Sequence, residues 1–304
     1  MSTNAQPIFS LVVATYGRAE VLQRLVASLL AQTCQRFEVI VADQNPDERV
    51  LSLIEPLRVA GRLGAHLRLP EPNLSAARNA GLAAARGDVV AFPDDDCWYE
   101  PETLAQAARH LGAASGLDGV AARWVEAAVE PGDLATGPIT AAAMRRFRGG
   151  NVASITLFLK RAAIEAVGGF DERIGVGRWY GAAEETDLVL ALIARGHRIA
   201  HARDVTVHHA YDETTARTVH VGRERARARG TGALYAKHRL PAWVILRGLL
   251  APLLATPGPD LAAGAARSLG RLEGMIRWNL VEQAPRPSTK RARSGPETKN
   301  ARDA

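Results

Sequence analysis

Three consecutive aspartates, Asp94, Asp95 and Asp96, are the side chains best placed to do chemistry. They follow an apolar run at 88–92 that predicts a buried strand, and a helix is expected to begin at Pro101. Like charges at the end of such a strand repel one another unless a cation neutralises them. Carboxylates suit Mg²⁺ or Mn²⁺, which usually arrive with a substrate's phosphates. A solvated, helix-capping turn is the competing interpretation, and the triplet alone does not separate the two.

The segments around the aspartates alternate between strand and helix. Apolar runs predict strands at 8–15, 37–44 and 88–92 with a weaker one at 66–72, and helical spacing predicts helices at 19–32, 47–59 and 75–87. This rhythm favours a parallel sheet covered by helices on both faces, which binds ligands beyond the carboxyl ends of its strands. Polar residues stand at those ends: Thr15, Tyr16 and Arg18 after the first strand, and Asp43 after the second.

The pattern changes after residue 118. Strands are predicted at 119–130 and 151–164, a helix from Ala183, and a pair of strands at 197–209 that ends in two histidines. An Arg-rich helical segment follows, and a tail rich in Pro, Ser, Lys and Arg is expected to be disordered. These changes predict a catalytic domain at 1–215, a basic helical extension at 216–283 and a disordered tail at 284–304.

Composition limits the class of protein. The chain has 304 residues, 47% hydrophobic and 23% charged, as in an ordinary globular protein. Two cysteines, Cys34 and Cys97, form no disulfide framework and fit a reducing cytoplasm. The first apolar run is too short for a signal peptide, and the stretch at 243–255 is too short to cross a bilayer. We therefore expect a cytoplasmic protein.

Charge is unevenly distributed along the chain. Residues 216–304 hold 17 Lys and Arg against 6 Asp and Glu, a net charge of +11, whereas residues 1–215 carry a net charge of −5. An acidic body with a basic tail indicates two separate tasks.

Five segments, in this order, resemble the family 2 glycosyltransferases. They are SLVVATYGR, EVIVADQN, NLSAARNAGLAAARGDVVAFPDDDCWY, GGFDERIG and GAAEETDLVLALIARGHRI, and together they cover roughly residues 8–215. The resemblance implies an α/β fold of the GT-A type, a Rossmann-like, mostly parallel sheet flanked by helices. It also implies an inverting, metal-dependent enzyme that moves a sugar from a UDP-, GDP- or dTDP-linked donor to an acceptor hydroxyl.

The resemblance assigns donor and metal roles to the sheet edge. Asp94 would face the donor ribose or the metal, Asp96 the metal, and Asp95 the donor. Asp43 would accept a hydrogen bond from the nucleobase, and Arg78 would meet a phosphate unless it is only a surface arginine. Thr15, Tyr16 and Arg18 would line the donor site. His208 is the expected additional metal ligand, with His209 and a structural role as the alternatives.

The resemblance also places the general base on the late helix. Glu185 occupies the base position, Glu184 is the alternative because a glutamate reaches one methylene further than an aspartate, and Asp187 would orient the site. The helix N-terminus is expected to keep Glu185 ionised. Trp179 and Tyr180 suit stacking on an acceptor sugar, and core packing is the competing use.

Three other functions compete with this interpretation. A sugar nucleotidyltransferase would carry a Gly-rich basic loop after the first strand, and ATYGRAE is not one. A processive membrane polymerase would carry Gln-x-x-Arg-Trp and membrane spans, but Gly175 stands where that glutamine is required. A non-catalytic nucleotide-sugar-binding module is disfavoured by the intact acids.

The basic extension lacks a nucleic-acid-binding motif and interleaved aromatics, so nucleic acid is not the expected partner. Contact with the anionic inner face of the cytoplasmic membrane, through Trp243 to Leu254 and nearby arginines, is expected instead. A peripheral enzyme of this kind suits a lipid-linked or cell-surface glycan acceptor, as in exopolysaccharide or cell-envelope assembly.

Overall fold

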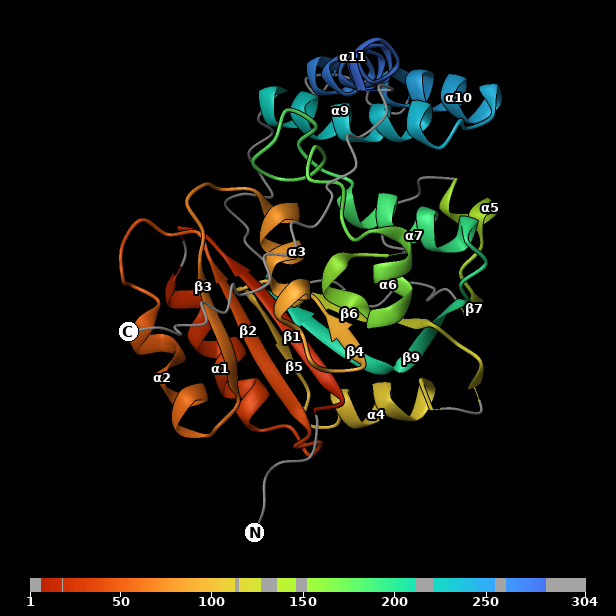
Figure 1. Cartoon of the computed structure of the whole chain (residues 1–304). Coiled ribbons are helices and arrows are strands. Elements are labelled where there is room, and N and C mark those ends of the chain that lie inside the picture. The colour runs from red at the N-terminus through yellow and green to blue at the C-terminus, as the bar shows by residue number, and fades with distance from the viewer. Residues whose placement is uncertain are drawn as a thin grey trace, which may run out of the picture.

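The structure is a computed structural model that describes residues 7–17, 19–112, 115–126, 136–145, 152–210, 221–254 and 261–282. An α/β body carries a layer of three helices from the C-terminal part of the chain (Figure 1). The predicted α/β class, with a mostly parallel sheet and helices on both faces, is confirmed.

The described strands form one sheet in the order β3-β2-β1-β4-β8-β6-β9-β5, and the short β7 pairs with β9. Their bounds are β1 Phe9–Thr15, β2 Phe37–Asp43, β3 Leu63–Arg68, β4 Val89–Ala91, β5 Cys97–Tyr99, β6 Gly119–Glu126, β7 Gly137–Pro138, β8 Leu157–Lys160 and β9 Ile199–His209. Strands β1 to β4 run parallel, and so do β6 and β9. Strand β8 is antiparallel to both of its neighbours, and β5 is antiparallel to β9. The carboxyl ends of β1 to β4 therefore meet at one edge, where ligands of such sheets bind.

Alternating side chains of the central strands enter two cores. Leu11 and Val13 of β1 pack with α1, α2 and α4 on one face, and Val12 packs with α3, α6 and α7 on the other. The helices of the body are η1 Ala19–Val21, α1 Leu22–Leu30, α2 Leu51–Val59, α3 Leu74–Ala84, α4 Thr103–His110, α5 Ala141–Met144, η3 Ser154–Thr156, α6 Arg161–Val167 and α7 Glu184–Ala194.

Helix α3 lies unusually close to the sheet. A Cβ atom at Gly81 would overlap the side chain of Val12, so only glycine permits this approach. The close contact brings the preceding turn of α3, which carries Arg78, down onto the carboxyl edge of the sheet.

Three predicted elements differ from the structure. The predicted strand at 151–164 is a strand only over β8 and continues as α6. The predicted strand pair at 197–209 is one strand, β9, whose pairing with β6 slips beside the exposed pair Arg203 and Asp204. Strand β5 intervenes after the aspartates, so α4 begins at Thr103 and not at Pro101. Each error arises because strand pairing depends on partners distant in sequence.

The C-terminal helices pack on the body and on one another. They are α9 Val221–Lys237, α10 Ala242–Leu254, α11 Leu261–Arg277 and the π-helical turn η5 Trp278–Glu282. Helices α9 and α11 touch backbone to backbone, because a Cβ atom at Gly232 or Gly274 would overlap a main-chain carbonyl of the other helix. Trp278 and two residues of α9 enter the core that also contains α7. The extension is thus attached to the half of the body that carries the predicted base.

Candidate active site

The aspartate triplet lies at the carboxyl edge of the sheet, where Asp94 pairs with Ala14 of β1 in an isolated bridge. The middle carboxylate, Asp95, is buried and accepts a hydrogen bond of 2.9 Å from the Thr15 hydroxyl. This bond ties the turn to β1. Thr15 and Asp95 thus bind each other, and the contact of both residues with a donor stays a prediction.

Arg78 is the central side chain of the site. It is only 1% exposed, which excludes the surface arginine considered from the sequence. Its Nη1 donates to Glu184 Oε1 at 3.0 Å, and its Nη2 donates to Asp94 Oδ1 at 3.1 Å and to Ser154 Oγ at 2.8 Å. Arg78 therefore joins the aspartate turn to the N-terminus of α7. Both terminal nitrogens are engaged by protein side chains, and a contact of Arg78 with a phosphate stays a prediction.

Glu184 and Glu185 have different environments although they are adjacent. Glu184 is buried against Arg78. Glu185 is half-buried, and no described side chain pairs with its carboxylate. An unpaired carboxylate can accept a proton from a substrate, whereas one held by an arginine is a weaker base. The geometry thus favours Glu185 over Glu184 as the base.

The pKa values of two acids are raised by burial and because negatively charged side chains lie close together in the site. Burial and the charge of Glu184 raise the pKa of Glu185 to about 8. Burial and like charge thus act against the expectation that the helix N-terminus keeps Glu185 ionised. Burial also raises the pKa of Asp94; Arg78 opposes this effect, while Asp96 and Glu184 add to it. Such crowding favours the binding of a cation.

The two histidines at the end of β9 face different partners because successive strand residues point to opposite faces. His209 Nε2 lies 3.2 Å from Asp96 Oδ1, and this contact raises the pKa of the imidazole, although burial opposes it. His208 Nε2 lies 3.0 Å from Glu100 Oε1, and its ring stacks on Trp98 with centroids 5.2 Å apart. His209, the alternative to His208, is thus the histidine beside the aspartates, and which of the two binds a metal stays a prediction.

The donor set fits a divalent ion that is shared with a substrate. Within the described ranges, no three His, Cys, Asp or Glu side chains converge tightly enough to hold a metal by themselves. Mg²⁺ commonly uses only one or two carboxylates and takes its other ligands from water and substrate phosphates. Asp94, Asp96 and His209 offer two carboxylates and an imidazole in a region of excess negative charge.

Asp43 does not face the edge as an open acceptor. Its fully buried carboxylate accepts from the backbone and side-chain nitrogens of Asn45 at 2.9 and 2.8 Å, and lies 3.0 Å from His66 Nε2 and 3.5 Å from Arg68 Nη1. In this arrangement Asp43 shapes the loop after β2, and its contact with a nucleobase stays a prediction. Asn45 in turn accepts from the Gly17 N–H at 2.7 Å.

Tyr16 is the exposed member of the predicted donor residues. Its side chain is 54% exposed at the end of β1, beside the loop that Asp43 and Asn45 order. A phenol in this position is accessible to a planar ligand. Arg18, the remaining donor residue expected after this strand, lies outside the described residues.

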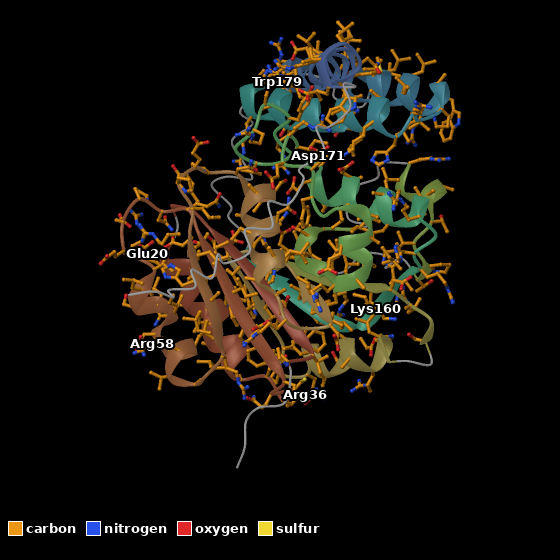
Figure 2. All side chains as sticks on the ribbon, viewed as in Figure 1. Glu20, Arg36, Arg58, Lys160, Asp171 and Trp179 are labelled. Carbon is orange, nitrogen blue, oxygen red and sulfur yellow. The ribbon has the colours of Figure 1, made fainter. Side chains whose placement is uncertain are left out.

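The predicted acceptor aromatics pack against the C-terminal helices. Trp179 lies between two guanidinium groups, Arg229 at 4.5 Å and Arg277 at 4.6 Å from the ring centroid. Tyr180 is buried and packs edge-on against Trp278 with centroids 5.5 Å apart. Figure 2 shows Trp179 beside the C-terminal helices. The stacking role is therefore corrected, and packing is the use made of both rings.

Asp187 is also bound by residues of the C-terminal extension. Its carboxylate bonds Lys237 at 2.6 Å and His238 at 2.7 Å, which attaches the first turn of α7 to the end of α9, and its role in orienting the site stays a prediction. Ser154 and His209 belong to the site as well, and no local sequence signal marks Ser154.

The arrangement defines a class of protein. A mostly parallel α/β sheet with acids at its carboxyl edge, faced by an acidic pair at the start of a helix, is that of a GT-A glycosyltransferase. Comparison with known proteins identifies the family: the model for "Glycosyl transferase family 2" matches residues 10–151. The succinoglycan biosynthesis protein ExoM of Rhizobium meliloti (strain 1021) is 30% identical over 296 residues, which cover 89% of this chain and 94% of ExoM. The chain belongs to glycosyl transferase family 2 and is an enzyme of that class.

Other similarities are shorter or concern the fold alone. The putative glycosyltransferase EpsH of Bacillus subtilis (strain 168) is 30% identical over 106 residues, which span 35% of this chain and 31% of EpsH. The mannosyltransferase PcManGT from Pyrobaculum calidifontis, solved with GDP-Man and Mn²⁺, superimposes with a TM-score of 0.63 at 17% identity, covering 91% of this chain and 88% of that one. S. aureus TarS 1–349, solved with UDP-GlcNAc, gives 0.58 at 18% identity over 89% of this chain and 92% of that one. These two structures support the GT-A fold.

Proposed function

We propose that this enzyme transfers a sugar from a nucleoside-diphosphate sugar to an acceptor hydroxyl with inversion, and that Glu185 is the general base. The observation that carries the proposal is the pairing within the acidic site. Arg78 bonds the buried Glu184 and the partly exposed Asp94, whereas no side chain among the described residues pairs with the carboxylate of Glu185, the next residue after Glu184. A base with a pKa of about 8 suits proton removal near neutral pH.

The residues that would hold a divalent ion are Asp94, Asp96 and His209. Mn²⁺ or Mg²⁺ bound there would neutralise the charge that develops on the departing diphosphate. The protein's own part is to hold these donors in place: Arg78 fixes Asp94, and the Thr15–Asp95 bond fixes the turn.

The donor is a nucleoside-diphosphate sugar. Two proteins of the same fold have been solved with UDP-GlcNAc and with GDP-Man and Mn²⁺, which supports this donor class without selecting the base or the sugar. The test is release of nucleoside diphosphate from a panel of UDP-, GDP- and dTDP-sugars, with and without Mn²⁺. Turnover of no donor by the folded full-length protein would contradict the proposal.

Inversion follows from a single displacement, in which Glu185 deprotonates the acceptor on the side opposite the leaving group. ¹H NMR of the product anomer checks this step directly. A product with the donor's configuration would rule out a single displacement.

We further propose a lipid-linked or surface-glycan acceptor presented at the inner face of the cytoplasmic membrane. The name of ExoM supports an exopolysaccharide-type pathway. Within the described ranges, no helix has both the length and the hydropathy to cross a bilayer. Helix α10 instead exposes Trp243, Leu246, Leu250 and Leu253, at spacings of three and four residues that form one stripe.

A second stripe on α11, Leu269, Leu272 and Ile276, is also exposed in this basic extension. Apolar stripes with surrounding positive charge suit an anionic lipid surface. The full-length protein should pellet with phosphatidylglycerol-containing vesicles at low salt, and less so at high salt.

The variant Leu246→Glu should lose roughly tenfold or more in vesicle partition, because burying a leucine contributes about 2 kcal/mol. Val59→Glu, at an exposed apolar position on α2, is the matched control and should bind normally. Equal partition of the two variants, or no binding by the wild type, would refute the membrane proposal.

A further inference from the structure

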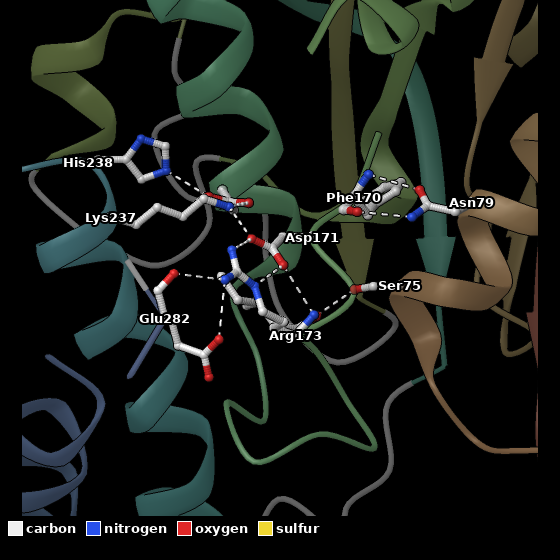
Figure 3. A network of polar contacts seen from close by, with 10 residues as sticks. Ser75, Asn79, Phe170, Asp171, Arg173, Lys237, His238 and Glu282 are labelled. Carbon is white, nitrogen blue, oxygen red and sulfur yellow. Dashed lines mark hydrogen bonds and ion pairs between the residues drawn. The ribbon is translucent and has the colours of Figure 1, made fainter. Parts of the chain in front are cut away.

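Lys237, the last residue of α9, binds two buried carboxylates that come from separate elements. Its Nζ donates to Asp171 Oδ2 at 2.7 Å and to Asp187 Oδ2 at 2.6 Å. The two aspartate side chains are 3% and 5% exposed, so neither can rely on water in place of the lysine. Figure 3 shows Lys237 beside Asp171.

Asp171 belongs to a loop that is fastened to α3. The adjacent Phe170 exchanges two backbone hydrogen bonds of 2.9 Å with the side chain of Asn79. Further along the loop, the Ser75 hydroxyl donates to the Ile174 carbonyl (Figure 3). Asn79 and Ser75 flank Arg78 on α3, so this loop is attached to the helix that positions Asp94 and Glu184.

Asp187 belongs to α7, two residues after the proposed base. It also contacts His238, whose Nε2 lies 2.7 Å from Asp187 Oδ1. The end of α9 therefore holds the first turn of α7, where Glu185 is located.

The ammonium is needed because the two carboxylates carry the same charge. Burial acts to raise the pKa of Asp171, but the bonds and charges of Arg173 and Lys237 outweigh it and hold the pKa below its usual range. Without Lys237 the paired aspartates would repel each other across the contact between the loop and α7. Such repulsion would cost stability, and loss of the two ammonium bonds would in addition release the first turn of α7 from the loop.

A second attachment shows what is particular to Lys237. Arg173 bonds Asp171 and also reaches the carbonyl and carboxylate of Glu282 in η5, at 3.1 and 3.2 Å. It joins the loop to the C-terminal turn, whereas Lys237 hydrogen-bonds an acid of the loop and an acid of the base helix at the same time.

We propose that Lys237 is a positioning residue for catalysis: its ammonium clamps the 170–175 loop to α7 and so fixes Glu185 relative to Asp94. The C-terminal helices are then part of the catalytic machinery and not an appendage to it. The inference rests on the proposed role of Glu185 as base. It predicts that replacing Lys237 lowers turnover and leaves binding of the donor nucleotide unchanged.

The experiment uses full-length protein and three variants. Lys237→Met removes the ammonium and keeps the apolar stem, Lys237→Arg keeps the charge, and Arg227→Met removes an exposed charge from the same helix as a control. Nucleoside-diphosphate release is measured on the donor panel with Mn²⁺, and UDP binding with Mn²⁺ is measured by calorimetry. Absence of turnover by the wild type would refute the proposed function, which separates that failure from failure of this inference.

Lys237→Met should lower kcat roughly tenfold to a hundredfold, as expected for a displaced reacting group, while the Kd for UDP stays within about twofold. Lys237→Arg should recover most of kcat, and Arg227→Met should match the wild type. A folded Lys237→Met protein with wild-type kcat would overturn the inference, and so would a loss of UDP affinity that accounts for the whole defect.

A last variant separates positioning from stability. Combining Lys237→Met with Asp171→Asn and Asp187→Asn removes the two buried charges together with the cation, which relieves the repulsion. This triple variant should unfold at a temperature closer to that of the wild type than Lys237→Met does, and still show the reduced kcat. Full recovery of kcat in the triple variant would show that the ammonium is needed only for folding, and the positioning role would be rejected.

Discussion

Arg78 Nη1 lies 3.0 Å from Glu184 Oε1, and the same guanidinium reaches Asp94 on the other side of the site. A residue of a small-residue helix thus connects the carboxyl edge of the sheet, the proposed metal site, with the helix that carries the proposed base. One buried cation brings the acids on the two sides close together, as joint action on a single substrate would require.

Replacing Arg78 should destabilise the folded protein. Arg78→Met leaves the carboxylate of Glu184 buried without its partner, so we expect a loss of about 3–5 kcal/mol in the free energy of unfolding measured with urea. Adding Glu184→Gln should recover part of this loss, because no buried charge then remains at that position. The control is Arg58→Met, which breaks an exposed pair with Glu55 and should change stability by about 0.5 kcal/mol or less. Equal losses in Arg58→Met and Arg78→Met would contradict the account.

Glu185→Gln should keep donor binding and lose turnover. Without a carboxylate to accept the acceptor's proton, kcat should fall roughly a hundredfold to ten-thousandfold, while the Kd for UDP with Mn²⁺ stays nearly constant. Glu165→Gln, at an exposed acid of α6 paired with Arg161, is the control and should leave kcat unchanged. Wild-type turnover in Glu185→Gln would transfer the role of base to another group.

The rate should depend on pH in one direction. Glu185 must be deprotonated to act, so kcat/KM of the free enzyme should rise with pH and level off above the pKa of about 8. Glu185→Gln should lack this rise. A wild-type profile that is flat from pH 6 to 9 would contradict the raised pKa.

The same pKa has a consequence for stability. Because the folded value of about 8 lies above the usual 4.5, the folded protein binds more protons than the unfolded chain between these values, and stability falls as pH rises across that window. Replacing the Glu185 carboxylate by an amide removes this dependence of stability on pH. The Tm of Glu185→Gln relative to the wild type should therefore be higher at pH 8.5 than at pH 5, as scanning calorimetry can measure.

The two histidines of β9 provide a matched pair for the metal site. His209→Ala should weaken Mn²⁺ binding in the presence of UDP by roughly tenfold, because it removes an imidazole that adjoins Asp96. His208→Ala should have little effect on Mn²⁺, since that ring is engaged by Glu100 and Trp98. Titration calorimetry with Mn²⁺ distinguishes them, and the reverse order of effects would restore His208 as the ligand.

The sequence predicts the half of the fold built from local patterns. Apolar runs and helical spacing correctly place β1, β2, α3 and α7, because each is decided by neighbours a few residues apart. Strand β5 was missed since its partner in β9 lies more than a hundred residues later, and no local signal marks the three residues Cys97–Tyr99.

The same distinction separates the site residues. Asp94 and Glu185 follow from strand and helix ends, which the chain itself encodes. Trp179, Tyr180 and Asp187 contact α9, α11 or η5, which follow later in the sequence. The sequence near the base therefore does not reveal that these side chains pack against the C-terminal helices. The burial of Arg78 likewise depends on the approach that Gly81 allows, which only the packed structure reveals.

The bond between Arg173 and Glu282 spans 109 residues of chain. During synthesis the N-terminal strands and helices leave the ribosome first and can fold early. The loop in front of the base, however, acquires its final anchor only when residue 282 has emerged. Until then, the nascent chain lacks the bond that fastens this loop to η5.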